Sequence, residues 1–265
     1  MPSEALRMPA VFFGHGSPMN TLESNRHTMA WEQFGQRAPR PRGILCVSAH
    51  WYIRGTAVTA MLQPRTIHDF GGFPQALFEV QYPAPGDPAL ASRVRDLLAP
   101  TEVIEDTSQW GLDHGTWSVL KHVYPKADVP VVQLAIDGTK PLADHYELAR
   151  HLAPLRDEGV LVVGSGNVVH NLGMARWEPG ATPHPWATRF NEAVRSRLLA
   201  NDHAALIDMS ALGEDGAMSI PTPEHYLPLL YVIALQQPED QVLFVTDGIE
   251  LGSISMMSVA VGAIQ

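Results

Sequence analysis

Short apolar runs alternate with polar segments that contain glycine and proline along this 265-residue chain. Residues 10–13, 43–47 and 160–163 are nearly unbroken apolar runs, with the length of strands that are buried on both faces of a sheet. Further strands are expected in five other segments, at residues 56–61, 102–104, 129–136, 241–245 and 253–261. The pattern predicts a sheet whose centre is covered on both faces.

Segments with a helical period lie between these runs. An apolar side chain recurs at every fourth position of residues 185–199, the spacing of a helix with one face on the core. The side chains of this stripe are those of Trp186, Phe190, Val194 and Leu198. Other helices are expected at residues 88–98, 115–123, 141–156 and 226–235. Because strands and helices alternate, we predict an α/β fold with a mostly parallel or mixed central sheet flanked by helices on both faces.

Composition agrees with one domain. A chain of this length with 45% hydrophobic residues can fill a sizeable core. The 22 prolines are scattered through short punctuating segments and form no low-complexity linker. We therefore expect residues 1–265 to form a single domain.

Charge and cysteine content limit the kinds of partner that the protein can bind and the cellular compartment in which we expect it. The formal net charge is −10, and the 18 Lys and Arg residues form no basic block, which argues against nucleic acid or an anionic membrane as partner. The one cysteine, Cys46, lies in an apolar run, so we expect a buried thiol and no internal disulfide. No apolar run approaches the roughly twenty residues of a membrane helix, and no charged stretch followed by a continuous apolar run stands near residue 1, so we expect neither export nor a membrane anchor. We expect a cytoplasmic protein.

Histidines stand where apolar runs end. His15, His50 and His170 each lie at or just beyond the C-terminal end of a predicted strand. In open α/β sheets ligands bind outside these strand ends, so the three side chains could meet there, and imidazole is the commonest metal ligand in proteins. His225 follows a Pro-Thr-Pro segment at a predicted helix start. The spacings match no compact zinc motif, so a metal centre and ordinary structural histidines both remain open from spacing alone.

Two further segments carry candidate chemistry. His114 follows Asp113, which we expect to be a helix N-cap, and the dipole of that helix would lower the pKa of the imidazole. A neutral imidazole there could relay a proton, or could simply bond to a nearby carbonyl. His68 and Asp69 lie in a loop with glycine and proline that could close over a cleft as a lid, or could be only a solvated loop.

Six motifs in order along the chain resemble those of a known family. They are FGHGSPMN at 13–20, VSAHW at 47–51, IHDFGGFP at 67–74, GLDHGTW at 111–117, SGNVVHNL at 165–172 and PTPEHYLP at 221–228. These segments look like those of the DODA-type extradiol aromatic ring-opening dioxygenases, which are class III extradiol enzymes. The group is related to protocatechuate ring-cleaving dioxygenases and to the plant DOPA dioxygenase of betalain synthesis. The resemblance runs from about residue 9 to the C-terminus.

The resemblance implies roles for particular residues. His15, His50 and His225 would hold a divalent metal, with His170 beside it as acid/base or as a further ligand. His114 would line the same pocket as a second catalytic residue. Class III relatives of the protocatechuate type use two histidines and one glutamate, the facial triad that suits non-haem Fe(II). Glu224 stands beside His225 at that third position, and the DODA-type pattern favours the histidine.

The implied activity is the opening of a catechol ring, such as that of DOPA, with O2 to give a semialdehyde. One divalent metal per subunit is expected, with Fe(II) required for activity because zinc cannot exchange an electron. Zn(II) also fits a site of three histidines and generally binds nitrogen ligands more tightly than Fe(II). Two alternatives stay open: a zinc hydrolase that activates water, and a non-catalytic metal-binding protein on the same scaffold. The identity of the catechol and the oligomeric state are not encoded in these motifs.

Overall fold

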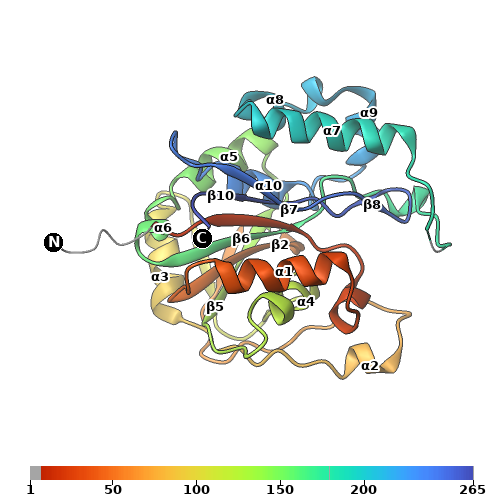
Figure 1. Ribbon diagram of the computed structural model, residues 1–265. Helices are drawn as coiled ribbons and strands as arrows, with labels where there is room; N and C mark the ends of the chain where they lie inside the picture. The colour runs from red at the N-terminus through yellow and green to blue at the C-terminus, as the bar shows by residue number, and fades with distance from the viewer. Residues whose placement is uncertain (1–6, 179, 265) are drawn as a thin grey trace.

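The computed structural model describes residues 7–178 and 180–264. Eight strands form its main sheet: β1 (Ala10–Gly14), β2 (Gly43–Ile53), β3 (Thr56–Thr59), β4 (Val103–Asp106), β5 (Val131–Asp137), β6 (Val160–Gly166), β7 (Val242–Thr246) and β10 (Ser258–Val261). Their order across the sheet is β4-β3-β5-β2-β6-β1-β10-β7 (Figure 1). The short strands β8 (Ile249–Glu250) and β9 (Ile254–Ser255) pair with each other in a separate ribbon.

The centre of the sheet is parallel. β6 pairs in parallel with β1 on one side and β2 on the other, and β2 pairs in parallel with β5. The outer strands bring in antiparallel pairs, because β3 runs against β5 and β10 runs against both β1 and β7. The sheet is therefore mixed, and the carboxyl ends of β1, β2 and β6 lie together at one edge.

Helices cover both faces of this sheet. The α-helices are α1 (Arg26–Arg37), α2 (Gln75–Phe78), α3 (Pro88–Leu97), α4 (His114–Val123), α5 (Leu142–Arg150), α6 (Pro154–Asp157), α7 (Pro185–Leu199), α8 (His203–Ile207), α9 (Gly213–Ser219) and α10 (Leu227–Ile233). Three short 3-10 helices are η1 (Pro18–Leu22), η2 (Leu172–Met174) and η3 (Met209–Leu212). In Figure 1, α1 and α4 lie on one side of the sheet and α5, α7 and α10 lie on the other.

Alternation along the central strands fills two cores. In β1, Phe12 packs with the residues of α5, α7 and α10, whereas Phe13 packs with those of α1 and α4. Both rings are fully buried, and each contributes roughly 1.5–3 kcal/mol of hydrophobic stabilisation. Phe13 meets Trp31 and Phe34 of α1 edge to face, at ring-centroid distances of 6.2 and 5.5 Å. The predicted α/β class with a covered sheet is confirmed.

Local signals set several helix starts. The carboxylate of Asp113 accepts from the backbone N–H of Thr116 at 3.1 Å, so the expected N-cap of α4 is present. Asp87 caps α3 in the same way. Pro88 occupies the first helical position, where a backbone N–H would have no partner within the helix, so the N–H that proline lacks costs no hydrogen bond. The N-terminus of α4 is thereby fixed against the edge at which β1, β2 and β6 end.

Two expectations about elements were wrong in detail, and one long helix was not expected at all. The helix predicted at 141–156 is two helices, because Pro154 cannot continue α5 and instead begins α6. The strand predicted at 253–261 is split into β9 and β10, since residues 254–255 pair with β8 whereas residues 258–261 pair with β1 and β7 in the main sheet. Helix α1 was not predicted, because its buried face holds only two large apolar side chains among polar ones.

The described residues include no helix that is both long enough and apolar enough to cross a membrane.

Candidate metal centre

Five histidines from five separate segments meet at the carboxyl-end edge of the sheet. They are His15 directly after β1, His50 in β2, His114 at the start of α4, His170 beyond β6 and His225 just before α10. The rings of His50 and His114 are 3.9 Å apart between centroids, and those of His170 and His225 are stacked at 3.4 Å. His15 lies 5.1 Å from His50 and 5.5 Å from His225 by the same measure. All four histidines of the predicted metal set thus lie in one place, with His114 beside them.

Main-chain contacts hold these segments together. The N–H of His15 donates to the carbonyl of Gly166 at 3.1 Å, and the N–H of Asn167 donates to the carbonyl of His225 at 2.8 Å. A side chain at Gly166 would overlap the carbonyl oxygen of His225, so glycine is needed for this close approach. The end of β6 is therefore the common support of His15 and His225.

His50 occupies an irregular part of β2. The prediction had placed it just beyond a strand that ends at Val47, but β2 continues to Ile53. The pairing of β2 with β5 shifts register between Val47 and Tyr52, and His50 lies within this stretch. Irregular strand segments of this kind commonly redirect a side chain next to a functional site.

The Nδ1 atoms of three of these imidazoles face acceptors. Nδ1 of His15 lies 3.0 Å from the hydroxyl of Ser165, whose own proton goes to the carbonyl of Gly115, so the imidazole is the donor. Nδ1 of His225 lies 3.2 Å from a carboxylate oxygen of Glu224. Nδ1 of His50 lies 3.1 Å from a carboxylate oxygen of Asp69. Each ring therefore carries its hydrogen on Nδ1 and keeps a lone pair on Nε2.

The lone pairs of His15 and His50 face each other. The Nε2 atoms of His15 and His50 are 3.2 Å apart, a distance at which two lone pairs repel unless a proton or a cation lies between them. Two nitrogens bound to one metal at about 2.1 Å, with the angles of tetrahedral or octahedral geometry, are about 3.0–3.4 Å apart. The donors of His15 and His50 therefore have the type and the spacing of two ligands that share one divalent metal.

Burial keeps most of the cluster uncharged. The pKa values of His15 and His225 lie well below the ordinary value, first because of burial and then because other histidines are close. Burial also lowers the pKa of His170 to about 4 and lowers that of His114. His50 differs: burial opposes its charge, but the interaction with Asp69 and nearby carboxylates outweighs burial and raises its pKa. Neutral imidazoles are the form that binds metal or accepts a proton.

Asp69 connects the loop before α2 to two of the rings. One carboxylate oxygen accepts from the backbone N–H of His114 at 2.8 Å, and the other lies 2.9 Å from Nδ1 of His114 and 3.1 Å from Nδ1 of His50. Contacts from these two histidines hold the pKa of the carboxyl far below its usual range, although burial acts the other way. From the sequence we expected this loop to be either a lid or a solvated loop, and no contact of Asp69 with the histidines was predicted. His68 faces away, since its Nε2 lies 2.9 Å from the carbonyl of Val80.

Glu224 stands behind His225. Its Oε1 accepts from the hydroxyl of Thr222 at 2.8 Å as well as facing Nδ1 of His225. The possible ligand atoms form two groups within 4.8 Å, one of His15, His50 and His114 and one of His170, Glu224 and His225. All five histidines of the cluster are in one or the other of these groups, with His15 and His50 in the first and His225 in the second.

The cluster opens into a cavity of about 590 Å³. Besides the five histidines, its walls include the apolar side chains of Pro18, Phe70, Phe73, Leu172, Trp177, Leu251 and Ile254. This is the size and the mix of apolar walls with few convergent polar groups that small-molecule sites have. The site can therefore hold a small, flat organic molecule against a metal.

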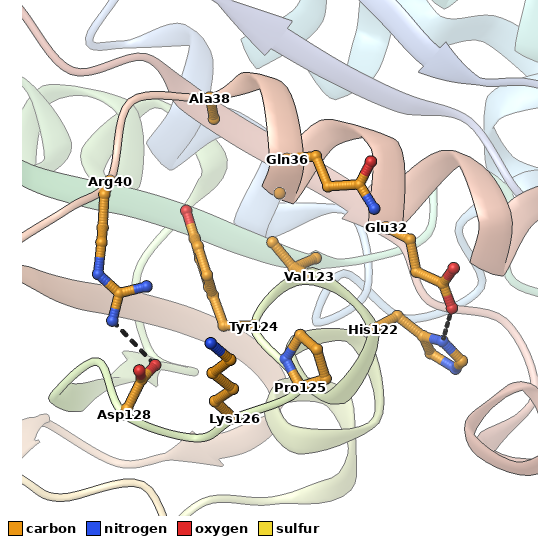
Figure 2. Close-up of a pocket in the computed structure, with 11 residues that line it drawn as sticks. Glu32, Gln36, Ala38, Arg40, His122, Val123, Tyr124, Pro125, Lys126 and Asp128 are labelled. Atoms are coloured by element: carbon orange, nitrogen blue, oxygen red, sulfur yellow. Dashed lines mark hydrogen bonds and ion pairs between the residues drawn. The ribbon is translucent and has the colours of Figure 1, made fainter.

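A second cavity of the same volume lies away from this edge, between α1 and the segment that follows α4 (Figure 2). Two pairs of its side chains interact: Arg40 with Asp128 at 2.9 Å and His122 with Glu32 at 3.2 Å. Unlike the histidine cavity, it gathers no group of three metal-ligating side chains among the residues that the structure describes.

Comparison with known proteins agrees with the geometry. The family described as the catalytic LigB subunit of aromatic ring-opening dioxygenase matches residues 10–262. The 4,5-DOPA dioxygenase extradiol of Escherichia coli K12 is 54% identical over 260 residues, which cover 97% of this chain and 95% of that protein. The 4,5-DOPA dioxygenase extradiol of Beta vulgaris is 34% identical over 235 residues, covering 86% and 87%. The crystal structure of an uncharacterized E. coli K12 protein, 49% identical, has a TM-score of 0.85 and covers 97% of this chain and 100% of that chain.

The match to one family extends over nearly the whole chain, as the six motifs predicted. The resemblance to extradiol ring-opening dioxygenases is thereby confirmed, and the histidine cluster is a site that could bind the metal on which such enzymes depend. The chain belongs to the LigB family of aromatic ring-opening dioxygenases and is a non-haem extradiol dioxygenase, an oxidoreductase.

Proposed function

We propose that this chain, acting as one catalytic domain, opens the ring of a catechol with O2 to give a semialdehyde. One divalent metal, Fe(II) in the active enzyme, is held by Nε2 of His15, His50 and His225. The observation that carries this proposal is that Nδ1 of each of these rings faces an acceptor, while the Nε2 atoms of His15 and His50 lie 3.2 Å apart. The name of the E. coli and Beta vulgaris relatives makes DOPA the first catechol to test.

Glu224 supports the third ligand and is not a ligand itself. Its Oε1 already faces Thr222 and Nδ1 of His225. A carboxylate in this position orients the imidazole and raises its basicity, as the partners of metal-bound histidines generally do. Compared with the pattern of two histidines and one glutamate, His225 therefore takes the place of the glutamate as ligand, and Glu224 supports His225 from its Nδ1 side.

Fe(II) supplies the one-electron chemistry that lets a catechol react with O2, which zinc cannot supply. The residues of the chain bind and orient the substrate and move its protons. Phe70 and Phe73 form apolar walls of the cavity, so a flat aromatic ring can pack there while its two hydroxyl groups face the histidines.

His170 is the proposed acid/base. Its pKa of about 4 leaves the imidazole neutral near pH 7, and in the described residues its ring nitrogens have no hydrogen-bond partner. A neutral ring beside the metal ligands can take a hydroxyl proton from the catechol and return it later in the reaction. His114, whose pKa is also lowered, faces the same cavity and is a second proton carrier.

The test is oxygen consumption by anaerobically purified, Fe(II)-reconstituted protein with DOPA and a panel of simple catechols, together with the absorbance of a yellow semialdehyde. We expect oxygen uptake and the chromophore to rise together. Hydrolysis of an ester without oxygen uptake would favour the zinc hydrolase, and no turnover with iron bound would favour a non-catalytic metal-binding protein.

Single variants assign the residues. Replacing His15, His50 or His225 by alanine should abolish tight metal binding, whereas His170→Ala should keep the metal and slow ring opening by about 10²–10⁴-fold. His151→Ala, at an exposed position, is the matched control and should change neither property. Loss of metal from His170→Ala would make this residue a fourth ligand, and loss from Glu224→Gln with retention in His225→Ala would overturn the ligand assignment.

A further inference from the structure

We infer that Asp69 is the positioning residue of this centre. Through one carboxylate it fixes the tautomers of His50 and His114 and fastens to them the loop that carries the aromatic wall of the cavity. The inference rests on the proposed function, because it takes His50 to be a metal ligand.

The first observation is the sharing of one carboxylate by two rings from different elements. One oxygen of Asp69 accepts from the backbone N–H of His114, and the other lies near Nδ1 of both His50 and His114. The two rings share this one oxygen, and the contact to Nδ1 of His114 is short without having hydrogen-bond geometry. A carboxylate only accepts hydrogen bonds, so it requires a hydrogen on both Nδ1 atoms and leaves both Nε2 atoms free.

The second observation is that this loop has its own anchors. The N–H of Ile67 donates to the carbonyl of Leu112 at 2.7 Å, and the indole N–H of Trp117 donates to the carbonyl of Ile67 at 2.7 Å. These bonds hold the start of the loop whether or not Asp69 is charged. Replacement of Asp69 therefore changes the site without removing the loop from the protein.

The third observation is that the residue after Asp69 forms the wall. The ring of Phe70 meets His114 edge to face at 5.4 Å and Phe73 at 5.4 Å. Gly71 and Gly72, between the two phenylalanines, have open space around them. The carboxylate of Asp69 is thus the polar contact that sets where this wall begins relative to the metal ligands.

An asparagine at this position has the same shape but the wrong hydrogen-bonding pattern. Its NH2 group must face either the backbone N–H of His114 or the two Nδ1–H groups, so one donor always meets another donor. The strain is relieved if His50 moves its hydrogen to Nε2, which blocks the lone pair that the metal needs. Asp69→Asn is therefore the most informative variant.

The experiment measures metal affinity and tautomers, with no substrate present. Zn²⁺ is titrated into the metal-free protein against a chelator, and nitrogen-15 NMR shifts of the histidine rings report which nitrogen carries the hydrogen. We expect Asp69→Asn to bind Zn²⁺ roughly 10–100-fold more weakly than the wild type. We also expect Nδ1–H forms of His50 and His114 in the wild type and an Nε2–H form in the variant.

Asp106→Asn is the matched control. Asp106 is also a loop carboxylate that accepts three backbone N–H groups, from Ser108, Gln109 and Trp110, but it lies outside the histidine cavity. The Asp106→Asn protein should bind Zn²⁺ as tightly as the wild type does. The inference would be overturned if Asp69→Asn bound Zn²⁺ with wild-type affinity. It would also be overturned if His50 carried its hydrogen on Nε2 in the wild type, a result that does not depend on whether a variant folds. Failure of the wild type to bind Zn²⁺ would instead count against the proposed function.

Discussion

A methyl group added at Gly115 should loosen the metal centre while leaving the fold intact. A Cβ at this position, in the first turn of α4, would lie 2.5 Å from the hydroxyl oxygen of Ser48 and 2.8 Å from Cδ2 of His50. Carbon atoms pack at about 3.5 Å or more, so the His50 ring must retreat by roughly 0.7 Å. Alanine gains about 1 kcal/mol of helix propensity over glycine, which offsets part of the roughly 1–3 kcal/mol that overpacking costs. We expect Gly115→Ala to lose at most about 2 kcal/mol of unfolding free energy.

Metal affinity should respond much more strongly than stability. A displaced His50 no longer directs its Nε2 at the position shared with His15, and a change of this kind beside a ligand costs roughly 10–100-fold in affinity. The assay is titration of the metal-free variant with Zn²⁺ against a chelator, followed by oxygen uptake with excess Fe(II) and a catechol.

Gly138→Ala is the matched control for this prediction. Its Cβ would also lie 2.8 Å from an aromatic ring, that of Tyr52, which follows His50 by two positions on β2. Tyr52 is 37% exposed and can swing into solvent, so this variant should keep wild-type metal affinity and activity. Equal affinities in the Gly115→Ala and Gly138→Ala proteins would refute the argument, because His50 would then be either mobile or no ligand.

Two predictions concern stability away from the site. Burial lowers the pKa of His145 to about 4. As the pH falls from about 6.5 toward 4, this side chain is therefore protonated in the unfolded chain but not in the folded protein, which lowers the unfolding free energy. At pH 5 this group alone should remove about 2 kcal/mol of the unfolding free energy found at pH 8. Urea unfolding at both pH values should show a smaller loss for His145→Gln, and an equal loss would contradict the assignment. Arg156 is fully buried and lies 2.5 Å from the carboxylate of Asp240. Its replacement by methionine should lower the unfolding free energy by about 3–5 kcal/mol, because the buried carboxylate is left without its charged partner. A urea midpoint unchanged from that of the wild type would show that solvent reaches this pair.

The sequence predicted what depends on neighbouring residues. Buried parallel strands are continuous apolar runs, so β1 and β6 and the edge at which they end could be predicted, and His15 and His170 with them. Contacts between distant segments could not be predicted. Ser165 supports Nδ1 of His15 from 150 positions away, and nothing beside either residue marks the pair. The role of Asp69 was missed for the same reason, because a loop residue acquires its partners only when the sheet and α4 have assembled.

This dependence on assembly links metal binding to the stability of the whole protein. His15 directly follows β1, His50 lies in β2, and His225 precedes α10. Because β1 and β2 flank β6, these three proposed ligands come together only when the centre of the sheet is formed. A metal that binds this arrangement and not the unfolded chain stabilises the fold by about 2.7 kcal/mol when its concentration is 100 times the Kd. Destabilising variants remote from the site, such as Arg156→Met, should therefore be partly rescued by added metal. Variants that damage the ligand geometry, such as Gly115→Ala, should gain much less, because for them a given metal concentration is a smaller multiple of the Kd.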